Sequence, residues 1–470
     1  MKPAPPTVPV RLISWLLATV VLFAPLSPAT AAYTVGDEQK AGEKIQSTIH
    51  QEFALLDDPD IDQYITHLGR EILAVAGPQY FDYRFYVVND SEFNAFAAPS
   101  GLVFINSGLI ETMDNENELV GVMAHEIGHV VRRHIADSIN KGTKIGIGTA
   151  AMILAGIALG GGNLSEAVIT GAMATGTSLN LKFSRENEEE ADRQSFTWMQ
   201  QMHRDQNSLL TMLAKMRKIS ILKTGKIPAY LLTHPAPEQR MDYVQDLLMS
   251  AGPDKQVTVT NNFRFTRIKY RIMLKTRDTT SLLPLLLKKA EATDEEGLMA
   301  RYGLALIYQD EGNLAKSRQY LQELISAHPE QPILKTDLGL GFVQEGKTDE
   351  GLKLFRAAHA DAPDDAYTTF QLAFTLDESG KTAEAIELYQ NLLSQTPSFA
   401  RLNFNLGRAL AKNGHADQGQ YYNGVYSWLE GNLPTATYHL KKALESLPAS
   451  DPLHDKSRDL LDKIKSLEKI

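Results

Sequence analysis

Two histidines four residues apart, with a glutamate directly after the first, are the residues of this chain best suited to chemistry. They lie in the stretch His125-Glu126-Ile127-Gly128-His129. Residues four apart share one face of an α-helix, so both imidazoles can bind one metal ion. Zinc would lower the pKa of a bound water to about 7, and the Glu126 carboxylate could take the proton as the water attacks an amide carbonyl. The pattern therefore predicts metal-dependent hydrolysis.

The flanking residues favour a helix around this motif. Asn115 can cap its amino terminus, and Glu118 follows three residues later as in a capping box. Apolar residues then recur at helical spacing, which predicts a helix buried in the core: Leu119, Val122, Met123, Ile127 and Val130. A core helix that contains two histidines but binds no metal is the alternative interpretation.

A second, acidic helix can supply a third metal ligand. The stretch from Ser184 to Asp192 holds five acids and continues as an amphipathic pattern. Zinc hydrolases of this kind use two histidines and one glutamate, which leaves the fourth position for water. Glu188 and Asp192 share a face, so one can bind the metal while the other steadies a histidine ligand. Spacing alone leaves open that these acids form a solvated face.

His234, which precedes Pro235, and Arg240 are two further candidates. His234 could stabilise the oxyanion of the transition state, or it could bind the metal as a fourth ligand, block water and make a latent protease. Arg240 could face the developing negative charge, because a fixed positive group there lowers the barrier. A surface turn followed by an arginine in a helix is the structural alternative.

These motifs, taken in order, resemble the metallopeptidase family of HtpX and the CAAX-prenyl endopeptidases. The resemblance covers about residues 33 to 250 and rests on the histidine motif, Ser184-Arg185, the run from Glu188 to Asp192, Thr233 to Pro237 with Arg240, and Asn94 to Gly101. It implies one Zn²⁺ per chain, with Glu188 as the third ligand and Asp192 as an associated acid. The fold it implies is an α+β, zincin-type (gluzincin) domain in a mainly α chain.

Composition bounds the partners and the ligands. The chain has 470 residues, of which 47 are basic and 57 acidic, and its formal net charge is −10. Such a balance argues against nucleic acid as the main partner, since nucleic-acid binding usually shows as a basic surface. No cysteine is present. Histidine and carboxylate side chains must therefore hold the metal.

The amino terminus has the features of an export signal. Lys2 and Arg11 are positively charged, Leu12 to Ala24 is mostly apolar, and Ala29-Thr30-Ala31 is a small-residue cleavage site. We expect residues 1–31 to be a cleavable signal peptide and the mature protein to be periplasmic. An uncleaved anchor is the alternative.

Residues 33 to about 115 are expected to mix helix and strand. Val35 to Ala76 has a mostly helical pattern, whereas Tyr83 to Val88 and Leu102 to Asn106 have the composition of strands. A strand that borders the metal cleft could hold an extended peptide through backbone hydrogen bonds. A hairpin packed on the helix fits the sequence equally well.

An uncharged stretch follows the histidine motif. Ile145 to Ser165 carries no charge over 21 residues and includes six glycines. Its length permits a membrane span. Its abundance of Gly and Ala instead favours a helix packed in the protease domain, or one that contacts a membrane surface peripherally. A mobile cover over the cleft is another interpretation.

The carboxy-terminal part of the chain repeats every 34 residues. Gly312, Gly346, Gly380 and Gly414 keep this step, and Gly431 then follows after 17 residues, which one extra helix would explain. A 34-residue period with small residues indicates tetratricopeptide repeats, whose concave surface suits extended segments of other proteins. The domains expected are a protease at 33–251, a linker at 252–262 and an α-helical tetratricopeptide solenoid at 263–470.

An exported protease joined to such repeats resembles the bacterial proteases that act in outer-membrane assembly. The resemblance implies a periplasmic zinc endopeptidase that degrades misassembled outer-membrane β-barrel proteins and could assist their assembly. Its partners would include the barrel-insertion machinery, and the repeats would bind substrate or partner. The alternative is a chaperone or scaffold of outer-membrane assembly with a structural or latent zinc site. An integral prenyl-type protease would require 145–165 to span the bilayer.

Overall fold

The computed structural model of the chain describes residues 33–141, 183–222, 229–235, 237–252, 257, 262–396 and 399–467. The expected signal peptide and the uncharged stretch at 145–165 lie outside these residues. Within the described ranges, every helix is too short or too polar to cross a membrane.

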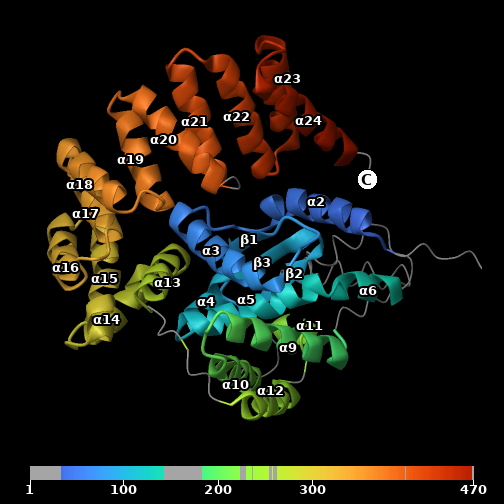
Figure 1. Ribbon diagram of the computed structural model, residues 1–470. Helices are drawn as coiled ribbons and strands as arrows, with labels where there is room; N and C mark the ends of the chain where they lie inside the picture. The colour runs from blue at the N-terminus through green and yellow to red at the C-terminus, as the bar shows by residue number, and fades with distance from the viewer. Residues whose placement is uncertain are drawn as a thin grey trace, which may run out of the picture.

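A three-stranded sheet lies at the centre of the amino-terminal part (Figure 1). The strand β1 (Arg84–Val88) pairs in parallel with β3 (Leu102–Asn106), and β2 (Ala95–Ala98) pairs antiparallel with the other side of β3. Because the order is β1-β3-β2, β1 and β2 are the two edges. Both predicted strands are present, and the segment between them contributes the third.

Helices cover both faces of this sheet. They are α2 (Val35–Glu52), α3 (Pro59–Ala76), α4 (Ser107–Thr112), α5 (Glu116–Val131), α6 (His134–Lys141), α9 (Arg185–Gln201), α10 (Asn207–Leu222), α11 (Ala229–Thr233) and α12 (Pro237–Ala251). Alternate strand residues face opposite sides: Phe85 and Val87 join the core around α3 and α5, whereas Tyr86 and Val88 pack beneath Ile45 of α2. The helix α5 thus lies between the sheet and α9.

The remaining helices form a solenoid of antiparallel pairs. They are α13 (Asn262–Thr276), α14 (Thr279–Lys289), α15 (Glu295–Asp310), α16 (Leu314–Ala327), α17 (Ile333–Gln344), α18 (Thr348–Asp361), α19 (Ala366–Glu378), α20 (Thr382–Gln395), α21 (Ala400–Lys412), α22 (Ala416–Leu429), α23 (Leu433–Ser446) and α24 (Pro452–Leu467). The predicted mainly α architecture, a small sheet domain followed by a helical array, is confirmed.

The recurring glycines end the first helix of successive pairs. Gly312, Gly346, Gly380 and Gly414 have φ values of 77°, 78°, 82° and 88°. This left-handed conformation suits glycine because a Cβ would strain it. Gly431, with φ 71°, follows α22 in the same way. Since α22 packs against both α21 and α23, one helix takes part in two successive pairs, which accounts for the 17-residue shift.

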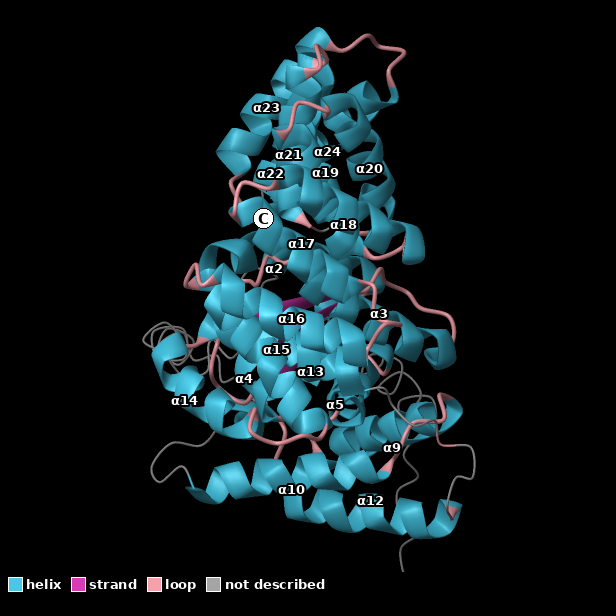
Figure 2. Ribbon diagram, turned by 90° about the vertical axis from the view of Figure 1, so that its left-hand side faces the viewer, coloured by secondary structure: helices cyan, strands magenta, loops and turns pink. Residues whose placement is uncertain are grey.

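The solenoid curves back over the amino-terminal part, as Figures 1 and 2 show from two directions. Its helix α19 contacts α3, and α22 contacts α2. The first helix, α13, is shared: Phe265 and Ile268 belong to the core around α5, whereas Phe263 and Tyr270 belong to the first core of the repeats. The proposed boundary at 252–262 therefore precedes a helix that packs into both units.

A buried cluster of charges joins α13 to the protease domain and to α17. Arg267, which is 1% exposed, forms an ion pair with Asp60 at the start of α3. The Arg271 guanidinium lies 2.9 Å from Asp60, 3.2 Å from Asp58 and 3.3 Å from Asp337. Buried charges are tolerated only when they are paired in this way, so the cluster fixes how the two units fit together.

The buried pair predicts a large loss of stability for Arg267→Ala. Because this change leaves Asp60 buried beside one cation fewer, we expect the free energy of unfolding to fall by about 3–5 kcal/mol. Arg356→Ala is the matched control, since Arg356 pairs with Glu384 where the two side chains are 47% and 40% exposed. An exposed pair of this kind contributes about 1 kcal/mol or less. Urea unfolding of both variants measures the difference, and equal losses would contradict the assignment.

Candidate metal centre

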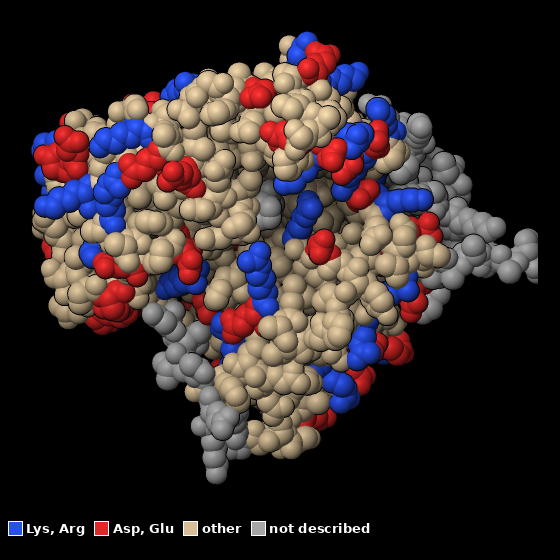
Figure 3. Space-filling model, turned by 45° about the horizontal axis from the view of Figure 1, so that its top comes forward, with Lys and Arg blue, Asp and Glu red and all other residues tan. Residues whose placement is uncertain are grey.

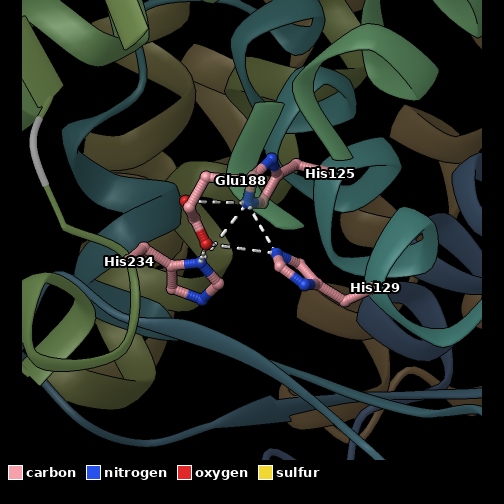
Figure 4. A group of neighbouring side chains, drawn as sticks. All are labelled: His125, His129, Glu188 and His234. Carbon is pink, nitrogen blue, oxygen red and sulfur yellow. Dashed lines mark hydrogen bonds and ion pairs between the residues drawn. The ribbon is translucent and has the colours of Figure 1, made fainter. Parts of the chain in front are cut away.

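Four buried side chains converge in the core of the protease domain (Figure 4). His125 and His129 come from α5, Glu188 comes from α9, and His234 follows α11 directly. One donor atom from each lies within 4.8 Å of the other three. Each residue is at most 2% exposed. The structure thus brings the two motif histidines together with Glu188, the acid implied as third ligand, and with His234.

The spacing of these atoms fits a tetrahedral zinc ion. The Nε2 atom of His125 lies 3.1 Å from Nε2 of His129 and 3.3 Å from Nδ1 of His234. The Oε1 atom of Glu188 lies 2.9 Å from that Nδ1 and 3.5 Å from Nε2 of His129. Donors about 2.0–2.1 Å from a tetrahedral zinc are separated by roughly 3.3 Å. Three imidazoles and one carboxylate are also a donor set that zinc accepts.

Local sequence sets the two helices that carry most of the donors. The Asn115 side chain accepts a hydrogen bond from the backbone N–H of Glu118 at 3.1 Å and caps α5 as expected. Ser184 and Asn187 form a capping box at the start of α9. Gly128 faces Ala191 where the helices pack, and a Cβ on Gly128 would lie 3.4 Å from the Ala191 backbone. The two helices are therefore in van der Waals contact at this point.

Asp192 supports the first histidine from behind. Its Oδ1 atom lies 2.9 Å from Nδ1 of His125, the ring nitrogen that points away from the other donors. A histidine that binds metal through Nε2 carries its proton on Nδ1, and a carboxylate at that position fixes both the tautomer and the orientation of the ring. The position of Asp192 fits the supporting role that the sequence suggested.

Arg240 pairs with both buried acids. Its Nε and one terminal nitrogen donate to the Asp192 carboxylate at 2.8 and 2.7 Å, and its other terminal nitrogen lies 2.9 Å from Oε2 of Glu188. Burial alone would raise the pKa of Glu188, but His234 and Arg240 outweigh it and hold that pKa well below its usual value. Burial would also raise the pKa of Asp192, but Arg240 and His125 outweigh this effect and lower that pKa. Both carboxylates are therefore ionised at neutral pH.

The second histidine has a support that the sequence reading missed. The Nδ1 atoms of His129 and His134 lie 2.9 Å apart, and Nε2 of His134 lies 3.1 Å from Oε2 of Glu190. Arg133, with φ 55°, separates α5 from α6 and turns the chain so that His134 faces back. The signal available was a third histidine five residues after His129. A metal-bound His129 could donate from Nδ1 to His134, which in turn donates to Glu190.

Glu126 lies beside the cluster without joining it. Its side chain is 1% exposed, its Oε1 atom lies 3.5 Å from Nε2 of His234, and that oxygen accepts no hydrogen bond from any residue in the described part of the chain. Burial raises the pKa of Glu126. A buried carboxylate oxygen with no donor is unfavourable in a folded protein, so its retention indicates a functional group.

His234 is held in place by its own short helix and by Tyr230. The His234 backbone N–H donates to the Tyr230 carbonyl at 2.8 Å, and the two rings stack with centroids 4.3 Å apart. Burial would lower the pKa of His234, but Glu188 and Glu126 raise it overall. The sequence left open whether this histidine reaches the metal or the oxyanion. In the structure its Nδ1 atom is one of the four converging donors.

The contact to His134 predicts weaker metal binding when that residue changes. We expect His134→Phe to reduce zinc affinity by about 10–100-fold, because loss of the outer partner frees the ring of His129. His439→Phe in α23, a partly buried histidine that contacts Gln420, is the control and should leave zinc affinity unchanged. Competition with a chromophoric chelator measures both. Equal affinities in the two variants would rule out the supporting role.

Comparison with known proteins identifies both parts of the chain. Peptidase family M48 matches residues 59–248. Models named TPR repeat and Tetratricopeptide repeat match residues 375–414 and 299–330. The resemblance drawn from the motifs and from the 34-residue period is confirmed.

Several relatives match parts of this chain. The Beta-barrel assembly-enhancing protease of Escherichia coli (strain K12) is 28% identical over 337 residues, which cover 70% of this chain and 68% of that protein. The protein of the same name from Yersinia pestis is 30% identical, covering 67% of this chain and 65% of its own. Metalloprotease LoiP of Escherichia coli (strain K12) is 32% identical over 36% of this chain and 64% of its own.

Proposed function

Because the chain is a metalloendopeptidase with a Peptidase family M48 domain and tetratricopeptide repeats, we propose that it is a periplasmic zinc enzyme that degrades misassembled outer-membrane β-barrel proteins. The name shared by two of its relatives, β-barrel assembly-enhancing protease, supports a role in outer-membrane assembly. The export signal expected at residues 1–31 supports the periplasmic location. The barrel-insertion machinery is the partner that such a role requires.

The donor cluster with Glu126 beside it is the observation that carries this proposal. His125, His129 and Glu188 would hold the ion, and zinc, when bound, supplies a Lewis acid that polarises a carbonyl and makes water acidic. Glu126 is the general base, since its free oxygen lies next to the cluster and burial, which raises its pKa, favours uptake of a proton. Asp192 orients His125, and Arg240 holds the two acids ionised.

Substrate would enter as an extended chain. The strand β2 is an edge of the sheet and packs against α5, the helix of the motif histidines. An edge strand can bind a peptide through backbone hydrogen bonds with little dependence on sequence. The concave side of the repeats would hold other parts of the same substrate, or the assembly machinery.

We further propose that the protease rests in a latent state. With the Nδ1 of His234 3.3 Å from Nε2 of His125 and 2.9 Å from Oε1 of Glu188, this histidine fills the fourth ligand position, which a hydrolase needs for water. Activity then requires the segment around α11 to move. A latent resting state would protect folded proteins from cleavage in a compartment that they share with unfolded substrates.

The same observation favours one rival function. Sites with four protein ligands are usually structural, so the chain could act as a chaperone or scaffold whose zinc holds α5, α9 and the α11 segment together. In that case the repeats carry the function by binding other proteins, and Glu126 has no catalytic role.

Glu126→Gln separates the two functions. We expect this variant to keep about one zinc per chain, because the four donors are untouched, and to lose cleavage of an unfolded β-barrel protein by at least 100-fold through loss of the base. Metal analysis and gel-based cleavage assays measure the two properties. A variant that cuts as fast as the unaltered chain would refute the catalytic role of Glu126.

His234→Ala tests the latent state. We expect the variant to bind zinc through three ligands, with lower affinity, and to cut casein several-fold faster than the unaltered chain because water gains the fourth position. His203→Ala, a change at a histidine outside the cluster, is the control. Faster cleavage that disappears in the double variant with Glu126→Gln would support the proposal. Zinc-loaded His234→Ala that cuts no faster would contradict it.

A further inference from the structure

Away from the metal centre, a cavity of about 700 Å³ lies between the protease domain and the repeats. Its walls come from the segment before α3, from α3 itself, from β1, and from α19, α21 and α22. A second cavity of about 580 Å³ adjoins it and shares Asp62 and Phe85 with it. Figure 3 views the hollow between the two units from above. Cavities of this size accommodate ligands well beyond single side chains.

The floor of this hollow is an incompletely paired strand edge. The carbonyl of Val87 accepts a hydrogen bond from Leu56 N–H at 2.9 Å, and Asn89 N–H donates to the Ala54 carbonyl at 2.7 Å. These bonds cover only the carboxyl end of β1. Because strand residues alternate in direction, the N–H and C=O of Phe85 point to the same side as those of Val87, away from β3. No described residue bonds to them there.

The opposite wall offers exposed aromatic side chains. Phe374 of α19 is 37% exposed and Phe404 of α21 is 43% exposed, and both line the larger cavity. Large apolar side chains left open to solvent in a recessed surface usually mark a binding site. They stand across the cavity from the edge of β1.

The larger cavity also has unbalanced negative charge. Asp57, Asp62 and Glu430 line it, and Arg401, which also lines it, forms an ion pair with Asp57 at 3.3 Å. The other charges of the lining are already engaged elsewhere: Asp58 pairs with Arg271 and Lys275, and Arg408 pairs with Asp377 and Glu378. Burial raises the pKa of Asp57 to about 6 and that of Asp62, which also faces Arg70, to about 7. A positively charged group in the cavity would stabilise the ionised carboxylates of Asp57 and Asp62.

We propose that the hollow is a second peptide-binding site, in which an extended segment of another polypeptide adds to the free edge of β1, places apolar side chains against Phe374 and Phe404, and directs a basic side chain to Asp57 and Asp62. Strand addition supplies affinity that is independent of sequence, and the aromatic and acidic groups supply selectivity. None of the four metal donors lines the hollow. The site therefore works whether or not the metal centre cleaves.

The test uses the mature chain with Glu126→Gln, which prevents cleavage, and a fluorescent decapeptide of alternating valine and threonine with a central lysine. We expect saturable binding by fluorescence anisotropy. The same peptide N-methylated at alternate amides should bind at least tenfold more weakly, because a methyl group replaces the N–H that would donate to the Phe85 carbonyl and cannot fit against the strand edge. Equal affinity of the two peptides, or no saturation up to about 1 mM, would overturn the proposal.

Two matched protein variants locate the peptide. Phe404→Glu should weaken binding at least tenfold, since it places a charge against the apolar side chains of the peptide. Tyr438→Glu changes an aromatic residue that is 58% exposed on α23, outside the hollow, and should bind as the parent chain does. Unchanged zinc content and melting temperature show that both variants fold. Equal binding by both variants would place the peptide elsewhere, for example on β2, and would overturn the proposal.

Discussion

The double pairing of Arg240 is the interaction on which the metal centre depends. Two carboxylates and three imidazoles are removed from water in the core, where an unpaired charge is strongly unfavourable. One guanidinium, itself 5% exposed, compensates both Asp192 and Glu188. It links α12 to α9, and through Asp192 it reaches His125 on α5. Three helices far apart in the sequence thus take their relative positions from one charge, and the donors are placed before any ion binds.

The junction between the protease domain and the repeats follows the same physical rule. Arg267 and Arg271 are compensated by acids from α3 and from α17, and the hydroxyls of Tyr302 and Tyr367 donate to Asp337 at 3.0 and 2.9 Å. Apolar side chains can shift slightly against one another at little cost, whereas a buried charge must keep its partner within ion-pair distance. A cluster of paired buried charges at the metal centre and another at the junction define the geometry of this protein, and apolar residues pack around each cluster.

Local patterns could be predicted from the sequence, and contacts between distant residues could not. The period of Gly312 and its equivalents and the capped helix around His125 each depend on residues within a few turns, so spacing was enough. Asp192, one partner of Arg240, lies 48 residues away in the chain, and Glu188, the other, lies farther away. The spacing of His134 in the sequence does not show that its side chain turns back onto His129. The spacing of the apolar residues of α13 does not show that they belong to two different cores. Those outcomes depend on the fold as a whole.

The shared helix α13 bears on how the chain acquires its structure. Phe265 completes the core around α5, and Arg267 meets Asp60 across 207 residues of sequence. Contacts between such distant residues form late, because closing a long loop is entropically unfavourable and slows folding. A chain emerging amino terminus first cannot finish its protease domain until α13 has arrived with the first repeat. The protease domain thus reaches its final structure only together with the first of the repeats.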